Sequence, residues 1–337
     1  MNLKDAYEFV SQLSLEEQKK LYLALGHDFE DTDPPSSQLI RDIRETRFHD
    51  SLACVHCGSK AVKRNGTYRA RQRYLCHDCG RSFNDCTKSP MAGTRYPNKW
   101  LAYIQYMVEG ISLRKIAEHL DIHLSTAFYW RHKVLYALRL IGFQPLQGIV
   151  ESDETYFLDS EKGKRDISHR KARKRGGSAS KRGISKEQVC VLVAHDRNGT
   201  LLSKRAGYGR ITATEIDEVM GHLLGGSLSL CRDEATNYKR FAELKGLEHH
   251  TINTRKKEYV KRGLYHIQHV NSYHNQLKGW LFRFRGVATK YLDNYLYWHQ
   301  FLYRRKKAKK QIQTEDMFLE GFRRASGVTV EKMGRIA

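Results

Sequence analysis

The sequence predicts a multidomain protein in which a small metal-bound ribbon and a helix-turn-helix precede an α/β domain with one mixed sheet. Three observations carry this prediction. Two Cys-x-x-Cys pairs stand close together in the first third of the chain, at Cys54 and Cys57 and at Cys76 and Cys79. Residues 96–142 follow with apolar residues at helical spacing. Beyond residue 147 strand and helix patterns alternate, as they do in α/β domains.

The composition fits a globular protein that binds a polyanion. Hydrophobic residues make up 40% of the 337, which is enough for a sizeable core and excludes disorder along the whole chain. A formal net charge of +22 favours nucleic acid, an anionic membrane surface or an acidic protein as partner. No apolar run approaches the roughly 20 residues needed to span a bilayer, and the N-terminus lacks a signal-peptide pattern. We therefore expect a cytoplasmic protein with reduced thiols and no membrane partner.

Residues 1–35 are predicted to form a short helical region that leads into a linker. Ser14 and Glu17 have the spacing of a capping box at the start of a helix. The stretch 28–38 is acidic and contains adjacent prolines, which is typical of a linker. The role of this N-terminal region does not follow from its sequence.

The two cysteine pairs predict a zinc ribbon over residues 45–88. Four thiolates satisfy a tetrahedral zinc ion, so we expect a structural ion that takes no part in chemistry. The loop between the pairs has six Lys or Arg and no Asp or Glu, which indicates a nucleic-acid contact. The residues expected to make it are Arg69, Arg71 and Arg73. Cys190 and Cys231 lie in apolar runs and are predicted to be core residues.

Residues 96–142 are predicted to form a helix-turn-helix region that binds DNA. A first helix stops at Gly110, Ser112 can cap the next one, and a short connection leads into a helix over 125–140. An ordinary helical hairpin would give the same pattern, and the neighbouring ribbon favours the DNA-binding interpretation. The side chains expected to face DNA are Thr126, Tyr129, Arg131 and His132.

The α/β domain is predicted over residues 147–305. Strand candidates at 147–160 and 227–238 contain carboxylates, and a hairpin over 189–206 turns at Asp196 to Gly199. Helices are expected at 213–224, 237–246, 266–283 and 288–304, with a further short strand at 248–253. This order of strand, hairpin, helix, strand, helix, strand and helix predicts one mixed sheet.

Two basic segments accompany this domain. Residues 161–188 contain eleven Lys or Arg among Gly and Ser, so we expect a flexible loop that contacts phosphate, although a solvated charge run is the simpler alternative. Its predicted DNA-binding residues are Arg170, Lys171, Arg173, Lys174 and Arg175. Residues 306–337 are expected to form a basic, solvated C-terminal tail.

A candidate catalytic site lies on the predicted sheet. Asp153 and Asp233 each fall at the expected C-terminal end of a strand, where ligands gather in open α/β sheets. Two carboxylates brought together there would hold Mg²⁺ or Mn²⁺. Asn271, His274 and Lys278 follow at spacings that place them on one helical face, as further groups of the site. The alternative is that these residues are ordinary surface acids and a solvated helix side.

Four segments together resemble an insertion-sequence transposase of the bacterial ISXO-like family: CVHCGS…RYLCHDCGRSF, ESDETYF, RDEATNY and HVNSYHNQLKGWL…GVATKYLDNYLYW. The resemblance implies an N-terminal zinc ribbon, a helix-turn-helix and an RNase H-like catalytic domain of the DDE type. It also implies that Asp153 and Asp233 are the first and second catalytic aspartates. Many relatives carry Glu three positions after the motif's Asn, where this chain has His274. Asn271, His274 and Lys278 thus remain alternatives for the third group, with Glu258 as an outside candidate.

The resemblance implies a transposase that binds terminal inverted repeats and performs metal-dependent strand cleavage and strand transfer. Its partners would be the double-stranded DNA of the element ends and of the target, bound by a homo-oligomer in the bacterial nucleoid. Because position 274 is not an acid, a domesticated, non-catalytic DNA-binding regulator is the alternative. A zinc-ribbon nuclease that cuts DNA without joining it is a third hypothesis.

Overall fold

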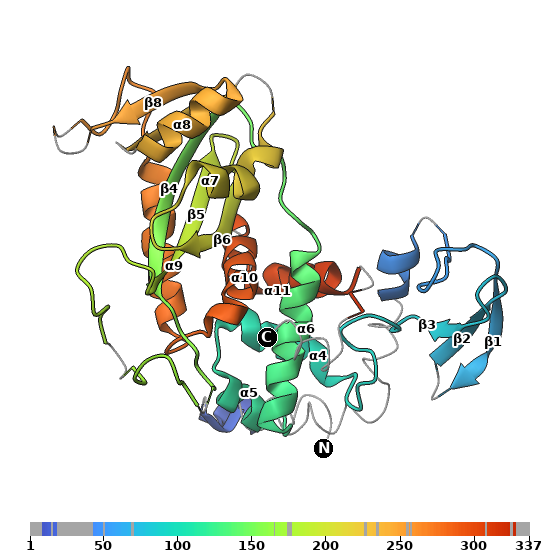
Figure 1. The fold of residues 1–337 in the computed structure, drawn as a ribbon. Helices are drawn as coiled ribbons and strands as arrows, with labels where there is room; N and C mark the ends of the chain where they lie inside the picture. The colour runs from blue at the N-terminus through green and yellow to red at the C-terminus, as the bar shows by residue number, and fades with distance from the viewer. Residues whose placement is uncertain are drawn as a thin grey trace. The chain divides into compact units, whose positions relative to one another are not determined.

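The chain consists of two compact units, Met1–Leu101 and Ala102–Ala337 (Figure 1). The computed structural model describes residues 9–14, 16–18, 43–49, 51–68, 71–164, 166–173, 177–225, 228–233, 236–253, 256, 258–306, 309–323 and 326–327. The second unit contains the larger sheet and nearly all of the region predicted to form a helix-turn-helix, residues 96–142. No helix in these ranges has both the length and the apolar character needed to cross a membrane.

The first unit contains a three-stranded antiparallel sheet in the order β1-β2-β3, where the zinc ribbon was expected. Its strands are β1 (Val62–Tyr68), β2 (Arg71–Cys76) and β3 (Ser82–Asn84). Tyr74 and Phe83 are buried against each other, with ring centroids 5.3 Å apart, and they pack beside the cysteines. A sheet this small has little apolar area to bury, so it needs a further source of stability.

The predicted capping box near the N-terminus is present. The Ser14 amide donates to Glu17 Oε2 at 2.9 Å, and the Glu17 amide donates to Ser14 Oγ at 3.4 Å. The predicted linker at 28–38 lies outside the described residues.

Three helices follow, at the expected positions: α4 (Lys99–Glu109), α5 (Leu113–His119) and α6 (Leu124–Arg139). Ser112 caps α5 by accepting from the Lys115 amide, as predicted. The helical spacing of apolar residues also predicts that Ile116, Ala117, Leu120, Ile122, Ala127 and Val134 are buried between α5 and α6. All are buried except Leu120, which is partly exposed. However, α6 packs against α10 and α11 as well as α5, so much of its surface is covered.

The second unit is built on a five-stranded mixed sheet in the order β6-β5-β4-β7-β8. Its strands are β4 (Ile149–Leu158), β5 (Gln188–Asp196), β6 (Leu201–Tyr208), β7 (Ser229–Asp233) and β8 (Glu248–Ile252). β4, β5 and β6 are antiparallel neighbours, whereas β4, β7 and β8 run parallel. The mixed sheet and the hairpin at 189–206 are thereby confirmed. Asp196 shapes the hairpin turn, because its Oδ1 accepts from the amides of Asn198 and Thr200.

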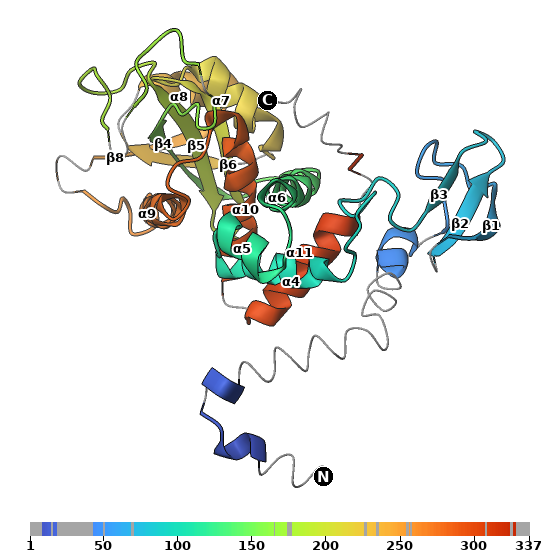
Figure 2. The ribbon, with the colours of Figure 1, turned by 90° about the horizontal axis from the view of Figure 1, so that it is seen from below.

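Helices cover both faces of this sheet (Figures 1 and 2). One face carries α7 (Ala213–Met220), a 3₁₀ turn at Gly221–Leu223, and α8 (Thr236–Lys245). The opposite face carries α9 (Gln268–Phe282) and, after a 3₁₀ turn at Thr289–Tyr291, α10 (Leu292–Arg304). Cys190 and Cys231 are 1% and 0% exposed, so their predicted place in the core is confirmed.

The prediction of a solvated tail is wrong for the start of the C-terminal segment. Residues Lys310–Arg323 form helix α11, which packs against α6. Met317, Phe318 and Phe322 are at most 2% exposed, and the two phenylalanine rings stack with centroids 4.4 Å apart. The basic residues at 304–311 favoured a solvated segment, although the apolar face of a helix begins directly after them.

Truncation of Phe322, a buried side chain of α11, should destabilise the second unit. Phe322→Ala removes a buried aromatic side chain, so we expect the free energy of unfolding to fall by about 3 kcal/mol. Ile312→Ala, on the same helix but 46% exposed, is the control and should cost less than about 1 kcal/mol. Urea unfolding measures both. Equally small effects of the two variants would contradict the packing of α11 and support a solvated C-terminal segment.

Candidate active site

Asp153 and Asp233 lie side by side on parallel strands. The β4–β7 register pairs Ile149 with Ser229 and Glu151 with Cys231, and the same offset brings Asp153 level with Asp233. Asp233 is the last residue of β7, as predicted. Asp153 lies in the middle of β4, so its prediction as a strand end is wrong. The strand continues because β5 still pairs with it as far as Leu158, beyond the end of β7.

A buried cation, Arg232, contacts the acidic cluster of Asp153, Glu154 and Asp233. Its Nη2 lies 3.6 Å from Asp153 Oδ1 and 2.9 Å from Glu154 Oε2, and its Nε lies 3.3 Å from Asp233 Oδ1. The guanidinium stacks 3.8 Å from the Tyr238 ring centroid. The sequence pattern did not predict a role for Arg232, although a basic residue directly before a candidate acid is present in the RDEATNY segment.

The negative charge of the cluster exceeds what Arg232 compensates. The pKa of Asp153 is raised to about 7, first by burial and then by the charges of Glu154 and Asp233, while Arg232 acts in the opposite direction. Burial also raises the pKa of Glu154, again against Arg232. A carboxyl that resists ionisation for this reason has room for another positive charge beside it. The donor set consists of oxygen ligands, which fits a hard divalent cation.

Of the three predicted residues on α9, His274 approaches the acidic pair. Its Nδ1 lies 3.9 Å from Asp153 Oδ2, and the side chain is 8% exposed. Burial, with a contribution from the Lys278 charge, lowers the pKa of His274 to about 4, so the imidazole is neutral at pH 7. Its buried Nε2 has no hydrogen-bond partner among the described residues. A neutral imidazole with an unused nitrogen is able to serve as a metal ligand.

Asn271 and Lys278 flank His274 on the exposed side of α9. Neither has a described side-chain contact with the two aspartates, although Lys278 is close enough to act electrostatically on His274. Glu258, the outside candidate, lies in the segment before α9 and is partly buried. The structure therefore places one of the three alternatives beside Asp153 and leaves the other two facing solvent.

The four predicted zinc ligands come together in the first unit. Their sulfur atoms all lie within 4.8 Å of one another, with Cys54 to Cys79 at 3.7 Å and Cys57 to Cys76 at 3.6 Å. A tetrahedral ion with bonds of about 2.3 Å holds sulfurs about 3.8 Å apart. A glycine in the left-handed backbone conformation directly follows each cysteine pair. The Gly58 amide donates to the Cys54 carbonyl, and the Gly80 amide donates to the Cys76 carbonyl. The geometry fits a tetrahedral metal centre.

Two of the four side chains predicted to face DNA from α6 are buried, so that part of the prediction is wrong. Arg131 and His132 are each 2% exposed. The Arg131 guanidinium lies over the Phe284 and Trp298 rings, and the His132 ring packs against Tyr291 in a tilted arrangement with centroids 4.1 Å apart. Thr126 and Tyr129 are partly exposed. Aromatic residues far along the chain cover the two buried side chains, which the local pattern did not reveal.

The basic loop holds part of its charge in internal pairs. Arg170 Nη2 lies 3.3 Å from Glu161, and Arg173 Nη2 lies 3.9 Å from Glu187, whereas Lys171 is exposed. In the ribbon, Arg71 and Arg73 lie on β2 and are partly exposed. The other predicted DNA-binding residues, Arg69, Lys174 and Arg175, lie outside the described residues.

Comparison with known proteins gives two matches. The family model of the ISXO2-like transposase domain matches residues 145–306. A protein of the transposable element ISH50 from Halobacterium salinarum is 30% identical over 259 residues, which cover 75% of this chain and 86% of that protein. This chain belongs to the ISXO2-like transposase family. The family match includes the whole five-stranded sheet, with Asp153, Asp233 and α9.

Two solved structures share a distant likeness with this transposase. The pre-cleavage Mos1 transpososome matches at 10% identity with a TM-score of 0.21, over 66% of this chain and 78% of that one. The Mos1 strand transfer complex matches at 12% identity with a TM-score of 0.23, over 64% and 77% of the two chains. At these scores the likeness does not define the fold.

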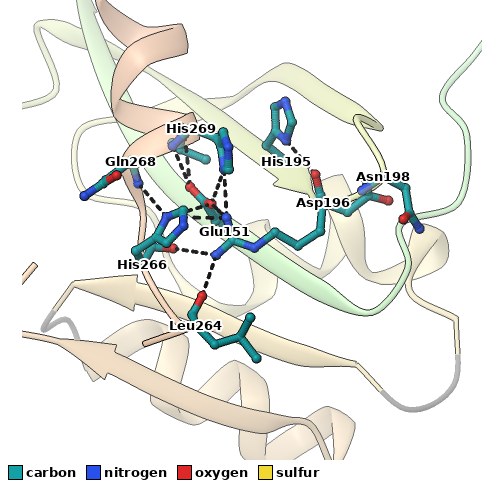
Figure 3. Close-up of polar contacts among 10 residues, drawn as sticks. Glu151, His195, Asp196, Asn198, Leu264, His266, Gln268 and His269 are labelled. Atoms are coloured by element: carbon teal, nitrogen blue, oxygen red, sulfur yellow. Dashed lines mark hydrogen bonds and ion pairs between the residues drawn. The ribbon is translucent and has the colours of Figure 1, made fainter. Parts of the chain in front are cut away.

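In this transposase a buried carboxylate, Glu151, fastens α9 to the sheet (Figure 3). Glu151 is 0% exposed, and its Oε2 accepts from the backbone amides of His269 at 2.9 Å and Val270 at 3.2 Å. Ile267 precedes α9 without a side-chain cap, so the capping carboxylate comes from β4. Glu151 and Asp153 share a strand face, because side chains alternate along β4. The contact thereby sets the position of α9 beside Asp153.

Glu151, His266 and His269 also have ligand atoms close enough to hold a metal, all within 4.8 Å. The Arg197 guanidinium already provides the positive charge there, since its Nη1 pairs with Glu151 Oε1 and lies 2.8 Å from His269 Nδ1 (Figure 3). We therefore interpret the group as a charge clamp. The sequence does not reveal this clamp, because a lone Glu two residues before Asp153 carries no distinctive signal.

Removal of the charge on Glu151 should loosen α9. Glu151→Gln keeps the side-chain shape but weakens the contacts with Arg197 and the two amides, so we expect a loss of about 2 kcal/mol in unfolding free energy. Amide hydrogen exchange at residues 269–273 should accelerate. Glu248→Gln, which alters a carboxylate–histidine contact at an exposed position, is the control. Unchanged exchange in α9 would contradict the clamp.

Proposed function

We propose that this chain is the catalytic transposase of an insertion sequence, which cleaves DNA at the element ends and joins them to target DNA. The observation that carries the proposal is the acidic pair of Asp153 and Asp233 on adjacent parallel strands, with the neutral imidazole of His274 beside it. Membership of the ISXO2-like transposase family supports it. The strand order and directions are compatible with the RNase H-like catalytic domain that the resemblance implies.

Asp153 and Asp233 would hold Mg²⁺ or Mn²⁺ through carboxylate oxygens, and His274 would complete the ligand set through a ring nitrogen. When bound, the metal supplies charge stabilisation and lowers the pKa of an attacking hydroxyl. Lys278, exposed on the same helix, would contact the phosphate next to the cleaved bond, and Asn271 would contact DNA about two turns earlier. Arg232 would keep the Asp153 and Asp233 carboxylates oriented through its contacts with both.

Both chemical steps are substitutions at phosphorus. In cleavage, water attacks the phosphodiester, the bond to the 3′-oxygen breaks, and that oxygen leaves as a 3′-hydroxyl while a 5′-phosphate forms. In strand transfer, the freed 3′-hydroxyl of the element attacks a target phosphodiester and displaces the target's own 3′-oxygen. The substrates would be double-stranded element ends and target DNA, bound by a homo-oligomer that holds two ends. The net charge of +22 supports an anionic partner of this kind.

Loss of either aspartate should abolish catalysis and spare DNA binding. For Asp153→Asn and Asp233→Asn we expect at least a roughly 10³-fold loss of metal-dependent nicking and joining of an end duplex, because the metal loses a charged ligand. Glu218→Gln, an exposed acid on α7, should keep full activity. Wild-type rates in either aspartate variant would reject this site.

A non-catalytic DNA-binding regulator is the second candidate, favoured by the imidazole at position 274 where an acid was expected. The same assay separates the two. A wild-type protein that binds the element ends but cleaves nothing in Mg²⁺ or Mn²⁺ would establish the regulator. Cleavage without joining would indicate a nuclease.

The four cysteines of the first unit would hold one structural zinc ion. Cys54→Ser should reduce the zinc content from one ion per chain and weaken folding of the ribbon and end binding, measured by metal analysis and circular dichroism. Cys86→Ala, a buried cysteine of the same unit outside the cluster, should retain the ion. A variant that binds ends normally but loses catalysis would contradict a purely structural zinc.

A further inference from the structure

The second unit contains a cationic cavity that the acidic site does not use. Its volume is about 560 Å³, and its walls come from the start of α5, the middle of α6 and the segment that joins α9 to α10. The described lining residues include no Asp or Glu. They include six cations: Arg114, Arg131, Lys162, Arg283, Arg285 and Lys290. Such a lining attracts an anion.

Arg131 lies in the floor of this cavity as an incompletely paired buried cation. It is 2% exposed, donates to the Ile111 carbonyl at 3.2 Å, and its Nε has no hydrogen-bond partner among the described residues. No carboxylate lies among the described residues lining the cavity, and the guanidinium lies over the Phe284 and Trp298 rings. Burial of a cation in this way is costly unless an anion joins it.

One wall of the cavity is aromatic. The Phe128 and His132 rings have centroids 4.5 Å apart, and Tyr291 lies 4.1 Å from His132. Phe128 and Tyr291 remain partly exposed. Burial, together with the charges of Arg131 and Lys290, lowers the pKa of His132 to about 3, so this ring is neutral and stacks as an aromatic surface. Rings that lie beside cations match a nucleobase attached to its phosphate.

A contact within the chain borders the cavity. Lys162 Nζ donates to the carbonyls of Phe284, Arg285 and Gly286 at 3.0, 3.2 and 2.7 Å. This contact fixes the segment after α9, which supplies three of the lining cations. A volume of this size is typical of a small-ligand site and has room for one nucleotide but not for a duplex.

The position of the cavity relates it to the acidic site. Arg283 directly follows α9 and comes nine residues after His274, which is about 13.5 Å at 1.5 Å per residue. DNA advances about 3.4 Å per nucleotide along one strand. For a strand that runs along α9 with its reactive phosphate at Asp153, a nucleotide about four positions away would therefore reach the cavity.

We propose that this cavity receives one nucleotide displaced from the duplex about four positions from the cleaved phosphate, with its base on Phe128 and Tyr291 and its phosphate among the cations. The inference rests on the proposed function for the identity of the DNA. Displacement costs the unpairing and unstacking of one base, which the aromatic wall and the charges offset.

The test is a scan of the end duplex, taken from the DNA that flanks the gene, with the full-length protein and fluorescence anisotropy. At the captured position, a mismatch should raise affinity because pairing is already lost, whereas an abasic site should lower it about tenfold because stacking is lost. A 2-aminopurine base there should show the fluorescence change of an unstacked base that enters a protein site. At other positions the two modifications should not act in opposite directions.

Tyr291→Leu should remove the dependence on the base, so that intact and abasic duplexes bind equally. Tyr259→Leu, an exposed tyrosine outside the cavity, should leave the dependence intact. A protein that binds the duplex but shows no such position, or a Tyr291→Leu variant with an unchanged profile, would overturn the cavity's role alone. A protein that binds no element-end duplex would overturn the proposed function and the captured nucleotide with it.

Discussion

The contact between Glu151 and the first turn of α9 is the constraint on which the described site depends. It joins a central strand, the hairpin residue Arg197 and a helix more than a hundred residues later in the chain. A buried carboxylate is tolerated only when it is paired and hydrogen-bonded, and here both conditions are met. Because the helix is fixed at its N-terminus, its middle meets Asp153 and its C-terminal end reaches the wall of the cationic cavity.

Positive and negative charges are separated in this transposase. The chain carries a net charge of +22, yet the centre of its larger sheet gathers Glu151, Asp153, Glu154 and Asp233. An excess of surface cations attracts DNA from a distance, whereas an acidic cluster repels a phosphate that comes close. A divalent cation between the acids and the phosphate would reconcile the two. The pKa of Asp153 is raised first by burial and then by the neighbouring carboxylates, and a cation beside it would oppose both effects.

Local signals predicted most elements of the fold. The hairpin, the strand that ends at Asp233 and the two long C-terminal helices lie where the pattern placed them. The predictions were wrong where exposure was inferred from the polarity of a residue and not from the residues that pack against it. Basic residues at 304–311 concealed the apolar face of α11, and the polarity of Arg131 and His132 predicted solvent exposure for side chains that aromatic residues cover. Asp153 was placed at a strand end because the extension of β4 depends on its pairing with β5.

The sequence by itself determined the cysteine cluster, the alternation of strands and helices, and the identity of two aspartates as candidates, because spacing and periodicity are local properties. It could not choose among Asn271, His274 and Lys278, since that choice depends on how α9 is rotated and placed against the sheet. Only the tertiary structure decided that His274 faces Asp153, that Arg232 lies among the acids and that Glu151 holds the helix. Those relations arise from packing between distant segments, which no local pattern encodes.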